Sequence, residues 1–407
     1  MQTLAIDFGT SNSAAAIAWD GGIYRIPVER GAETLPTAVF FPAEGGAMRI
    51  GAAAGDALIA REDGRYMRAL KSVLGHPLLH ESRLIGGKRR TVAQIITAFL
   101  TELRTRAEAQ TGQRFPRALS GRPVHFNDDA AKDAQAEADL RACYLAAGFE
   151  AVEFLPEPEA AAIACADMGG AEEIGLIVDI GGGTSDFSVF HQGRILASHG
   201  IRLGGTDFDH AVSMAHAMPE LGLNGQLRRE MGAGLLPVPR APYVDLATWA
   251  KIPFLYTPET RRLVKGMVRS AVEPQRMARF ATVIEDELGH ELAFAVERGK
   301  IAANGAAEGR IAMGFIEKGL SAGITAASLN AALHDARLRL REAAALTLAM
   351  AGVAPGDVGR VILVGGSSLM AVVAEESTAL CPGARLLRSE AFTAVVDGLA
   401  LAARQSR

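Results

Sequence analysis

The most informative part of the sequence is Leu176-Ile-Val-Asp-Ile-Gly-Gly-Gly-Thr-Ser-Asp186, followed by Phe187-Ser-Val-Phe190. An apolar run that ends in Asp179, three glycines, and a second apolar run predict a β-hairpin with a glycine tip. Glycines let backbone N–H groups approach an anion closely, and the Thr184 hydroxyl adds a donor. Because Asp179 and Asp186 would repel a bare phosphate, a cation is expected between them, most simply Mg²⁺ that keeps several waters. A tight turn after an aspartate is the alternative that this stretch alone leaves open.

The same pattern occurs near the start of the chain. The run Ile6-Asp-Phe-Gly-Thr-Ser-Asn-Ser13 lies between the apolar segments 4–6 and 14–17, and repeats the order of strand, aspartate, glycine, hydroxyl groups and strand. Internal repetition identifies the structural unit, which here is half a protein. Two such hairpins facing each other can hold a polyphosphate and its metal ion. A third stretch, Val361-Ile-Leu-Val-Gly-Gly-Ser-Ser368, predicts a buried strand that runs into a Gly-Gly-Ser turn.

In this order the three stretches resemble the phosphate-one, phosphate-two and adenosine motifs of the actin, sugar kinase and heat-shock ATPase superfamily. The first two are most similar to the DnaK family of heat-shock chaperones, and the resemblance runs from residue 4 to about residue 403. It implies an α/β fold with two lobes, built from duplicated ribonuclease H-like domains around a central nucleotide cleft. It also implies ATP or ADP, Mg²⁺ and K⁺ as cofactors, slow ATP hydrolysis, and lobe closure that controls a protein partner.

The resemblance assigns a role to individual residues. Lys71 lies in Ala69-Leu-Lys-Ser-Val-Leu-Gly75, which looks like the segment with the catalytic lysine, and Glu157 lies in a Pro-Glu-Pro-x-Ala-Ala-Ala run that resembles the first connecting motif. A snorkelling surface lysine and a carboxylate at a helix start are the structural alternatives. The catalytic candidates are Asp7, Lys71, Glu157, Asp179, Thr184 and Asp186, and the three aspartates are the metal candidates, mainly through water. The nucleotide-binding candidates are Gly9, Thr10, Ser11, Asn12, Gly181, Gly182, Gly183, Thr184, Gly204, Gly205, Glu297, Lys300, Ile301, Gly365, Gly366, Ser367 and Leu369.

Two of these positions depart from the family pattern. A helix predicted over 280–303 carries Glu297 and Lys300, which share a helical face as an ion pair or, by the resemblance, contact ribose. The arginine that follows in the family is Ile301 here, and the arginine of the adenosine motif is Leu369. The slot for the base is therefore expected to be aliphatic, with weaker ATP binding or tolerance of another base.

Further segments define the expected domains. Helices are predicted over 91–110, 127–148, from Ser328 to about 351, and from Phe392 to 403, whereas 222–258 carries five prolines and predicts an insertion of turns and extended segments. Lobe I is expected to comprise residues 1–172 plus 385–407, with a subdomain at about 37–115. Lobe II is expected to comprise 173–384, with a subdomain at about 220–319. No substrate-binding domain is expected after the last helix, so the chain should not hold unfolded peptides.

Composition limits the classes of partner. The 407 residues are 49% hydrophobic, and 42 basic against 46 acidic residues give no field that favours nucleic acid or an anionic membrane. The run Lys88-Arg-Arg90 is interpreted as a solvated loop, and three widely spaced cysteines exclude a disulfide framework. With no signal peptide and no long apolar run, a soluble, cytoplasmic monomer is expected.

Other nucleotide-dependent classes of protein are alternatives to this interpretation. The absence of a GxxxxGK[ST] sequence excludes a P-loop enzyme. The alternatives that stay open are an actin-like, nucleotide-gated assembly protein, a pseudo-ATPase, and a sugar-kinase-like protein, although no acid and amide pair suited to a sugar is found.

Overall fold

The computed structural model describes residues 2–19, 22–165, 173–192, 194–229, 231–305, 308–388 and 393–405. The chain divides into two compact units. Unit 1 comprises Met1–Gly205 and Arg337–Arg407, and unit 2 comprises Thr206–Ala336. The lobe boundaries near residues 172 and 385 stay predictions, and Phe392, the predicted start of the last helix, lies outside the described residues.

The first sheet of unit 1 is formed by the N-terminal hairpin and two later strands. Its order is β11-β10-β1-β2-β3, and β4 pairs with β2 beside this path. β1 runs antiparallel to β2 and parallel to β10, which is parallel to β11. The strands are β1 (Thr3–Phe8), β2 (Asn12–Trp19), β3 (Gly22–Arg25), β4 (Thr34–Pro36), β10 (Arg117–Arg122) and β11 (Ala151–Pro156).

The second sheet of unit 1 repeats this topology. Its order is β14-β13-β12-β19-β20, so a three-stranded antiparallel meander is again extended by two parallel strands on the side of its first strand. The strands are β12 (Ile174–Ile180), β13 (Ser185–His191), β14 (Arg194–Ile201), β19 (Val358–Val364) and β20 (Arg385–Arg388). The repeat inferred from the two glycine hairpins is thus confirmed as a repeat of whole sheets.

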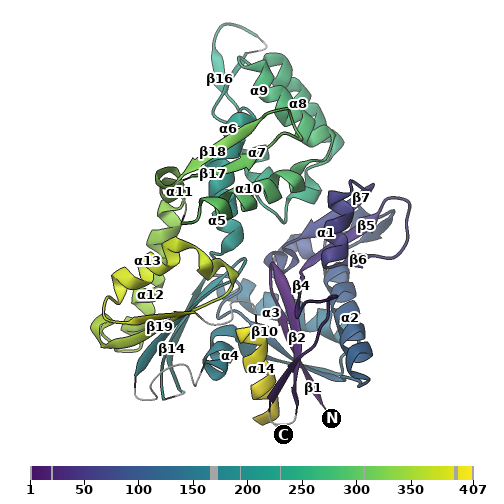
Figure 1. Ribbon diagram of the computed structural model, residues 1–407. Helices are drawn as coiled ribbons and strands as arrows, with labels where there is room; N and C mark the ends of the chain where they lie inside the picture. Colours follow the sequence, from purple (N-terminus) through teal and green to yellow (C-terminus); the bar gives the residue numbers. More distant parts are fainter. Residues whose placement is uncertain are drawn as a thin grey trace. The chain divides into compact units, whose positions relative to one another are not determined.

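Small residues let two helices cross closely beside these sheets. A Cβ atom at Gly398 of α14 (Ala394–Gln405) would lie 1.7 Å from the Ala160 carbonyl oxygen of α4 (Glu157–Ala164), so no larger residue fits there. In Figure 1, α14 lies next to β1 and β2, with which it packs. One apolar core therefore joins α4 and α14 to strands of both sheets, through residues such as Ala5, Ile177 and Leu399.

Among the other elements of unit 1, two helices carry clear capping signals. Thr91 and Gln94 form a capping box at the start of α2, and Asp129 caps α3 by accepting from two backbone N–H groups. Residues 88–90 form strand β9, which pairs with β8 across a Gly86-Gly87 turn, so the interpretation of this run as a loop is wrong. The elements are α1 (Ala52–Ile59), α2 (Val92–Thr111), α3 (Ala130–Ala146), α13 (Ala371–Leu380), β5 (Ala38–Pro42), β6 (Arg49–Ile50), β7 (Gly64–Arg68), β8 (Arg83–Ile85) and β9 (Lys88–Arg90).

Unit 2 has its own aromatic core. Tyr243 stacks on Phe280 with ring centroids 4.4 Å apart, and Trp249 meets Phe294 edge to face at 5.0 Å. The segment 222–258 contains the extended strands that were predicted, but it also contains helix α7, which carries buried Tyr243, and it includes buried Trp249. The prediction of turns and extended segments alone is therefore wrong. Its elements are α6 (Met218–Glu220), α7 (Ala241–Leu246), α8 (Pro258–Ser270), α9 (Pro274–Glu285), α10 (Gly289–Ala303), α11 (Ala326–Ala332), β15 (Gln226–Arg228), β16 (Leu235–Pro237), β17 (Glu308–Ala312) and β18 (Ser321–Thr325). Two helices span the boundary with unit 1: α5 (Gly205–Val212) and α12 (His334–Met350).

Two predicted helices are each divided into two in the structure. The helix predicted over 280–303 is interrupted between α9 and α10, where Glu287 adopts a left-handed φ of 55°. The helix predicted to begin at Ser328 begins earlier in the structure. Thr325 is the N-cap of α11, and Ser328 completes its capping box. That helix then ends at Ala332, and α12 begins at His334.

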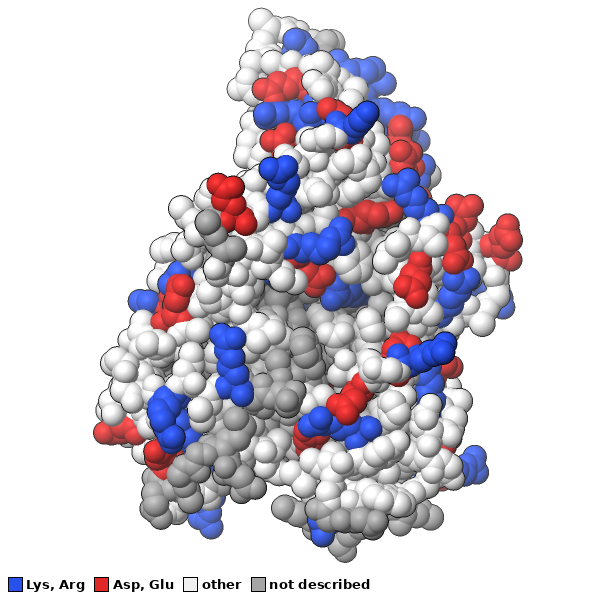
Figure 2. Space-filling view, in the orientation of Figure 1, with Lys and Arg blue, Asp and Glu red and all other residues white. Residues whose placement is uncertain are grey.

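Charged side chains of both signs are distributed over the surface. On the face shown in Figure 2, basic and acidic groups alternate without a large area of one sign, as the nearly balanced composition predicts. Among the described residues, no helix combines the length and the apolar character needed to cross a bilayer.

Candidate active site

Two glycine hairpin tips touch within unit 1. A Cβ atom at Gly182 would lie 2.4 Å from Ser11 Oγ, and one at Gly9 would lie 2.2 Å from the Asn12 carbonyl oxygen. The second tip is closed by the Gly181 N–H group, which donates to the Thr184 carbonyl oxygen at 3.0 Å. A side chain at either glycine would therefore displace backbone or hydroxyl groups that form the loops.

Three aspartates lie on the strands that lead into or out of these tips. Asp179 and Asp186 are cross-strand partners in β12 and β13, so their side chains leave the sheet on the same face. Both are buried, with 6% and 1% of their surface exposed, whereas Asp7 on β1 is partly buried. Such burial is costly for a carboxylate without a compensating positive charge.

Burial and mutual repulsion raise the pKa of each aspartate. Burial and the Glu157 charge raise the pKa of Asp7 to about 7, although Lys71 opposes this shift. The same two causes raise the pKa of Asp186 to about 8, against a hydrogen bond from the Val124 N–H group. Burial and the neighbouring carboxylates hold the pKa of Asp179 well above its usual range. The site is thus built to receive positive charge.

Lys71 and Glu157 form a buried ion pair beside the aspartates. Lys71 Nζ lies 2.6 Å from Glu157 Oε1, with 7% and 12% of the two side chains exposed. Burial opposes the lysine charge, but Glu157 and Asp7 outweigh it, so the pKa of Lys71 is raised. Lys71 is held in a 3₁₀ turn, Leu70–Val73, that follows Ala69 in the left-handed region at φ 58°. The lysine is therefore a fixed cation and not a flexible surface side chain.

The Gly-Gly-Ser turn after β19 completes the site. Gly365 has φ 81°, and a Cβ there would lie 2.4 Å from the Ile180 carbonyl oxygen and 2.6 Å from Asp179 Oδ1. The Gly205 N–H group donates to the Gly181 carbonyl oxygen at 3.0 Å. Because Gly205 also leaves no room for a Cβ beside Ser367, three separate chain segments meet here.

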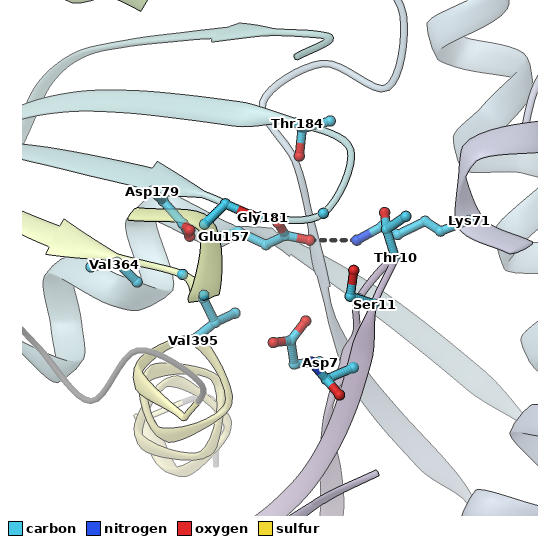
Figure 3. Close-up of a pocket in the computed structure, with 16 residues that line it drawn as sticks. Asp7, Thr10, Ser11, Lys71, Glu157, Asp179, Gly181, Thr184, Val364 and Val395 are labelled. Atoms are coloured by element: carbon cyan, nitrogen blue, oxygen red, sulfur yellow. Dashed lines mark hydrogen bonds and ion pairs between the residues drawn. The ribbon is translucent and has the colours of Figure 1, made fainter. Parts of the chain in front are cut away.

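A cavity of about 110 Å³ lies among these segments, entirely within unit 1. Figure 3 shows Asp7, Asp179 and the Lys71–Glu157 pair around one space. The lining residues are Asp7, Gly9, Thr10, Ser11, Asn12, Lys71, Glu157, Asp179, Gly181, Gly182, Thr184, Val364, Gly365, Gly366, Ser367 and Val395. Most of the candidates from the sequence are therefore brought together, and their chemical roles stay predictions.

Some candidates in unit 1 do not line the cavity. Asp186 accepts a hydrogen bond from the Val124 N–H group at 2.7 Å, and a Cβ at Gly204 would lie 2.5 Å from the Gly183 nitrogen. Leu369 does not line the cavity and has 41% of its surface exposed.

Comparison with known proteins agrees with this geometry. A protein-family model described as "Hsp70 protein" matches residues 3–225, which is more than half of the chain. The chain belongs to the Hsp70 family. The predicted family is thus confirmed, and with it the actin-like ATPase fold that the repeated sheets display.

Individual relatives match part of their own length. The chaperone protein DnaK of Thermosipho melanesiensis is 34% identical over 218 residues, which cover 51% of this chain and 34% of that protein. The chaperone protein HscA homolog of Pseudomonas aeruginosa is 32% identical over 294 residues, which cover 67% of this chain and 46% of that protein. This Hsp70-family chain therefore spans between about a third and a half of the length of these curated relatives.

The remaining nucleotide-binding candidates lie on α10 in unit 2. Lys300 is buried, and its Nζ lies 2.7 Å from Asp209 Oδ1. Trp249 Nε1 donates to the other oxygen of Asp209 at 3.1 Å. Ile301 has 60% of its surface exposed, and Glu297 lies one turn before Lys300 on the same helix. The lysine assigned to ribose by resemblance is thus already engaged by a carboxylate.

Sequence reasoning missed several residues around these sites. Val364 and Val395 line the cavity without polar groups, Val124 contributes only its backbone N–H, and Asp209 pairs with Lys300. Asp209 stands in the glycine-rich stretch 203–209 and could have been noticed there. The others carry no chemical signal, because backbone groups and aliphatic walls are defined only by the fold.

The aspartates fit a hydrated divalent cation. In the described part of the chain, no group of three His, Cys, Asp or Glu side chains is close enough to bind an ion directly. Mg²⁺ commonly keeps several waters, so a water-mediated contact with Asp7, Asp179 and Asp186 suits this spacing. The pKa of each aspartate is raised first by burial and then by the charge of Glu157, and a bound cation would oppose both effects.

Proposed function

We propose that this chain is a nucleotide switch that binds ATP with Mg²⁺ and hydrolyses it slowly to ADP and phosphate. The observation that carries the proposal is the enclosed Lys71–Glu157 pair, which faces buried aspartates beneath two glycine tips. Hsp70 proteins bind nucleotides, and the comparisons place this chain in that family. K⁺ is proposed as a second cation of the same site.

The phosphates are proposed to bind at the hairpin tips. The hydroxyl groups of Thr10 and Thr184 line the cavity beside the backbone of the glycine tips, and supply donors that suit phosphate oxygens. Asp7, Asp179 and Asp186 would hold hydrated Mg²⁺, which when bound neutralises phosphate charge. Gly9 and Gly182 leave no space for a Cβ atom, and the absence of side chains at these positions lets a phosphate approach the backbone.

Hydrolysis is proposed to rest on positioning and charge. Phosphoryl transfer requires in-line alignment and stabilisation of developing negative charge more than covalent chemistry. Lys71 Nζ, fixed by Glu157 at 2.6 Å, supplies a cation that need not reorganise. Glu157 Oε1 and Lys71 Nζ are proposed to orient the attacking water.

Nucleotide-dependent partner binding is the proposed output. The matched DnaK and HscA relatives are named chaperone proteins, which supports a protein partner. A ligand changes a conformational equilibrium only through different affinities for the two conformations. We therefore propose that ATP and ADP favour different conformations, and that a partner protein binds one of them.

The test is calorimetric ATP titration followed by single-turnover hydrolysis, each with and without Mg²⁺. Binding that requires Mg²⁺ and slow phosphate release support the proposal. Binding without hydrolysis supports the pseudo-ATPase alternative, and polymer that pellets only with ATP supports the assembly protein. Failure to bind ATP in the presence of Mg²⁺ would contradict all three.

A further inference from the structure

A second cavity lies in unit 1 and shares no residue with the phosphate pocket. Its volume is about 420 Å³, within the range of sites that bind small molecules. It is lined by β5, β9, α2 and the loop before β6, through the residues Phe41, Met48, Lys88, Arg89, Arg90, Gln94, Ile95 and Ala98. The proposed ATPase function uses none of them.

The wall formed by the β8–β9 hairpin is fixed by close packing. Gly86 has φ 56°, and a Cβ there would lie 2.7 Å from Phe41 Cβ, so the turn rests directly on β5. The Arg90 guanidinium lies 4.8 Å from the centroid of the Phe41 ring and donates to the carbonyl oxygens of Ile85 and Gly86. These contacts with β5 hold the β8–β9 hairpin, and with it this wall of the cavity, in place.

Positive charge on this wall is not neutralised by the protein. Throughout the described ranges, Lys88, Arg89 and Arg90 form no ion pair with a carboxylate, and no acidic residue lines the cavity. Nearby arginines behave differently, since Arg49 pairs with Glu62 at 2.7 Å and Arg83 pairs with Glu81 at 2.6 Å. The basic side chains of this cavity are thus open to pairing with an anion from outside the chain.

The rest of the lining is apolar, with one oriented polar group. Phe41 and Ile95 are buried core residues, and Met48 and Ala98 extend the apolar lining. Gln94 Oε1 accepts from the Thr91 N–H group at 3.0 Å in the capping box of α2. This bond fixes the amide, and the NH₂ group of Gln94 has no hydrogen-bond partner in the described part of the protein. It is available as a donor.

We propose that this cavity binds a small amphipathic organic anion. Its carboxylate, sulfonate or phosphate group contacts Lys88 and Arg89, and its hydrocarbon part packs against Phe41 and Ile95. The basic side chains favour an anion over a neutral molecule. The apolar lining adds affinity for a hydrocarbon part, which a simple inorganic ion lacks. The proposal does not depend on ATP binding.

The test compares two fluorescent probes on the intact chain. 8-Anilinonaphthalene-1-sulfonate carries the aromatic rings and an anionic group, and N-phenyl-1-naphthylamine carries the same rings without charge. The folded protein is expected to bind the sulfonate saturably. The double variant Lys88→Ala/Arg89→Ala should bind it about tenfold more weakly, because hydrogen bonds to charged groups are lost, while affinity for the uncharged probe is unchanged.

A second variant tests the cavity volume. Ala98→Phe should fill the apolar part and abolish binding of both probes, whereas Arg49→Ala, which removes a charge outside the cavity, should bind both as the parent does. Equal affinity for the sulfonate in the parent, the double variant and Ala98→Phe would overturn the proposal, as would absence of saturable binding by the parent. If Ala98→Phe does not fold, the selective loss of the sulfonate in the double variant decides.

Discussion

At the scale of single residues, the proposed function predicts that the ammonium of Lys71 is required for the reaction of phosphate. It is the cation that Glu157 fixes at 2.6 Å among carboxylates. Lys71→Ala should reduce single-turnover ATP hydrolysis about 100-fold, since one preorganised electrostatic group is lost, with a small change in nucleotide affinity. Lys251→Ala is the matched control, because that lysine is exposed and paired with Asp245 in unit 2. Parent rates in both Lys71→Ala and Glu157→Ala would contradict the catalytic assignment.

The buried aspartates predict a pH dependence of stability without nucleotide or Mg²⁺. The pKa of Asp7 is raised to about 7 and that of Asp186 to about 8, so between about pH 4 and pH 8 the folded state binds more protons than the unfolded state. The free energy of unfolding contributed by these groups is therefore fully present at low pH and is lost as pH rises through this window.

Replacing one aspartate should remove part of this loss. Asp186→Asn keeps an acceptor for the Val124 N–H group, and should raise the free energy of unfolding relative to the parent by about 1 kcal/mol or more near pH 8, but not near pH 4. Urea unfolding at both pH values measures this difference. Glu62→Gln, which changes an exposed pair, should show no such dependence. The same difference at both pH values would contradict the electrostatic explanation.

At the scale of elements, the two hairpin tips depend on each other. A Cβ at Gly182 would lie 2.4 Å from Ser11 Oγ and 3.0 Å from Thr10 Cβ, so a branched side chain there must displace the first tip and occupy the phosphate space. Gly182→Val should abolish measurable ATP binding in calorimetry. Gly383→Val is the control, because no atom lies within 4 Å of its Cβ position. Unchanged ATP affinity in Gly182→Val would place the phosphates elsewhere.

The buried ion pair of Lys300 with Asp209 is expected to stabilise unit 2. Burial raises the pKa of Asp209, and Lys300 opposes that shift, so the lysine compensates a buried carboxylate. Lys300→Ala should lower the free energy of unfolding by about 3–5 kcal/mol, because an uncompensated charge stays buried. Lys300→Ala combined with Asp209→Asn should recover much of the loss in urea unfolding. A parent-like midpoint for Lys300→Ala would show that the pair is not structural.

The elements also show what the sequence could specify. The glycine hairpins, β19 and α2 could be predicted because their signals are local. Apolar runs, glycine tips and capping residues each depend on only a few neighbouring residues. The break between α9 and α10 was missed because apolar spacing continues across Glu287, where a backbone turn and the contact of Gly289 with Tyr256 interrupt the helix. The Lys300 partner was missed for a related reason: Asp209 is distant in sequence, and only packing in unit 2 brings it near.

At the scale of the whole molecule, the cavity proposed to bind phosphate belongs to one of two units. All its lining residues lie in unit 1, whereas the core around Trp249 lies in unit 2. A ligand that binds only the folded state stabilises it by mass action, by about 2.7 kcal/mol at 100 times the dissociation constant. A ligand that consists of phosphate groups without a nucleoside is therefore expected to stabilise unit 1 before unit 2.

The two tryptophans make this separation measurable. Trp19 in unit 1 is 52% exposed, and its replacement in Trp19→Phe leaves buried Trp249 as a fluorescence reporter of unit 2. Magnesium pyrophosphate should raise the thermal transition seen by far-UV circular dichroism, which includes unit 1, and leave the Trp249 transition in place. EDTA should reverse the shift, because without Mg²⁺ the aspartates repel the phosphates. An equal rise of both transitions would show that the units unfold as one cooperative body, and no rise in either would remove pyrophosphate from the pocket.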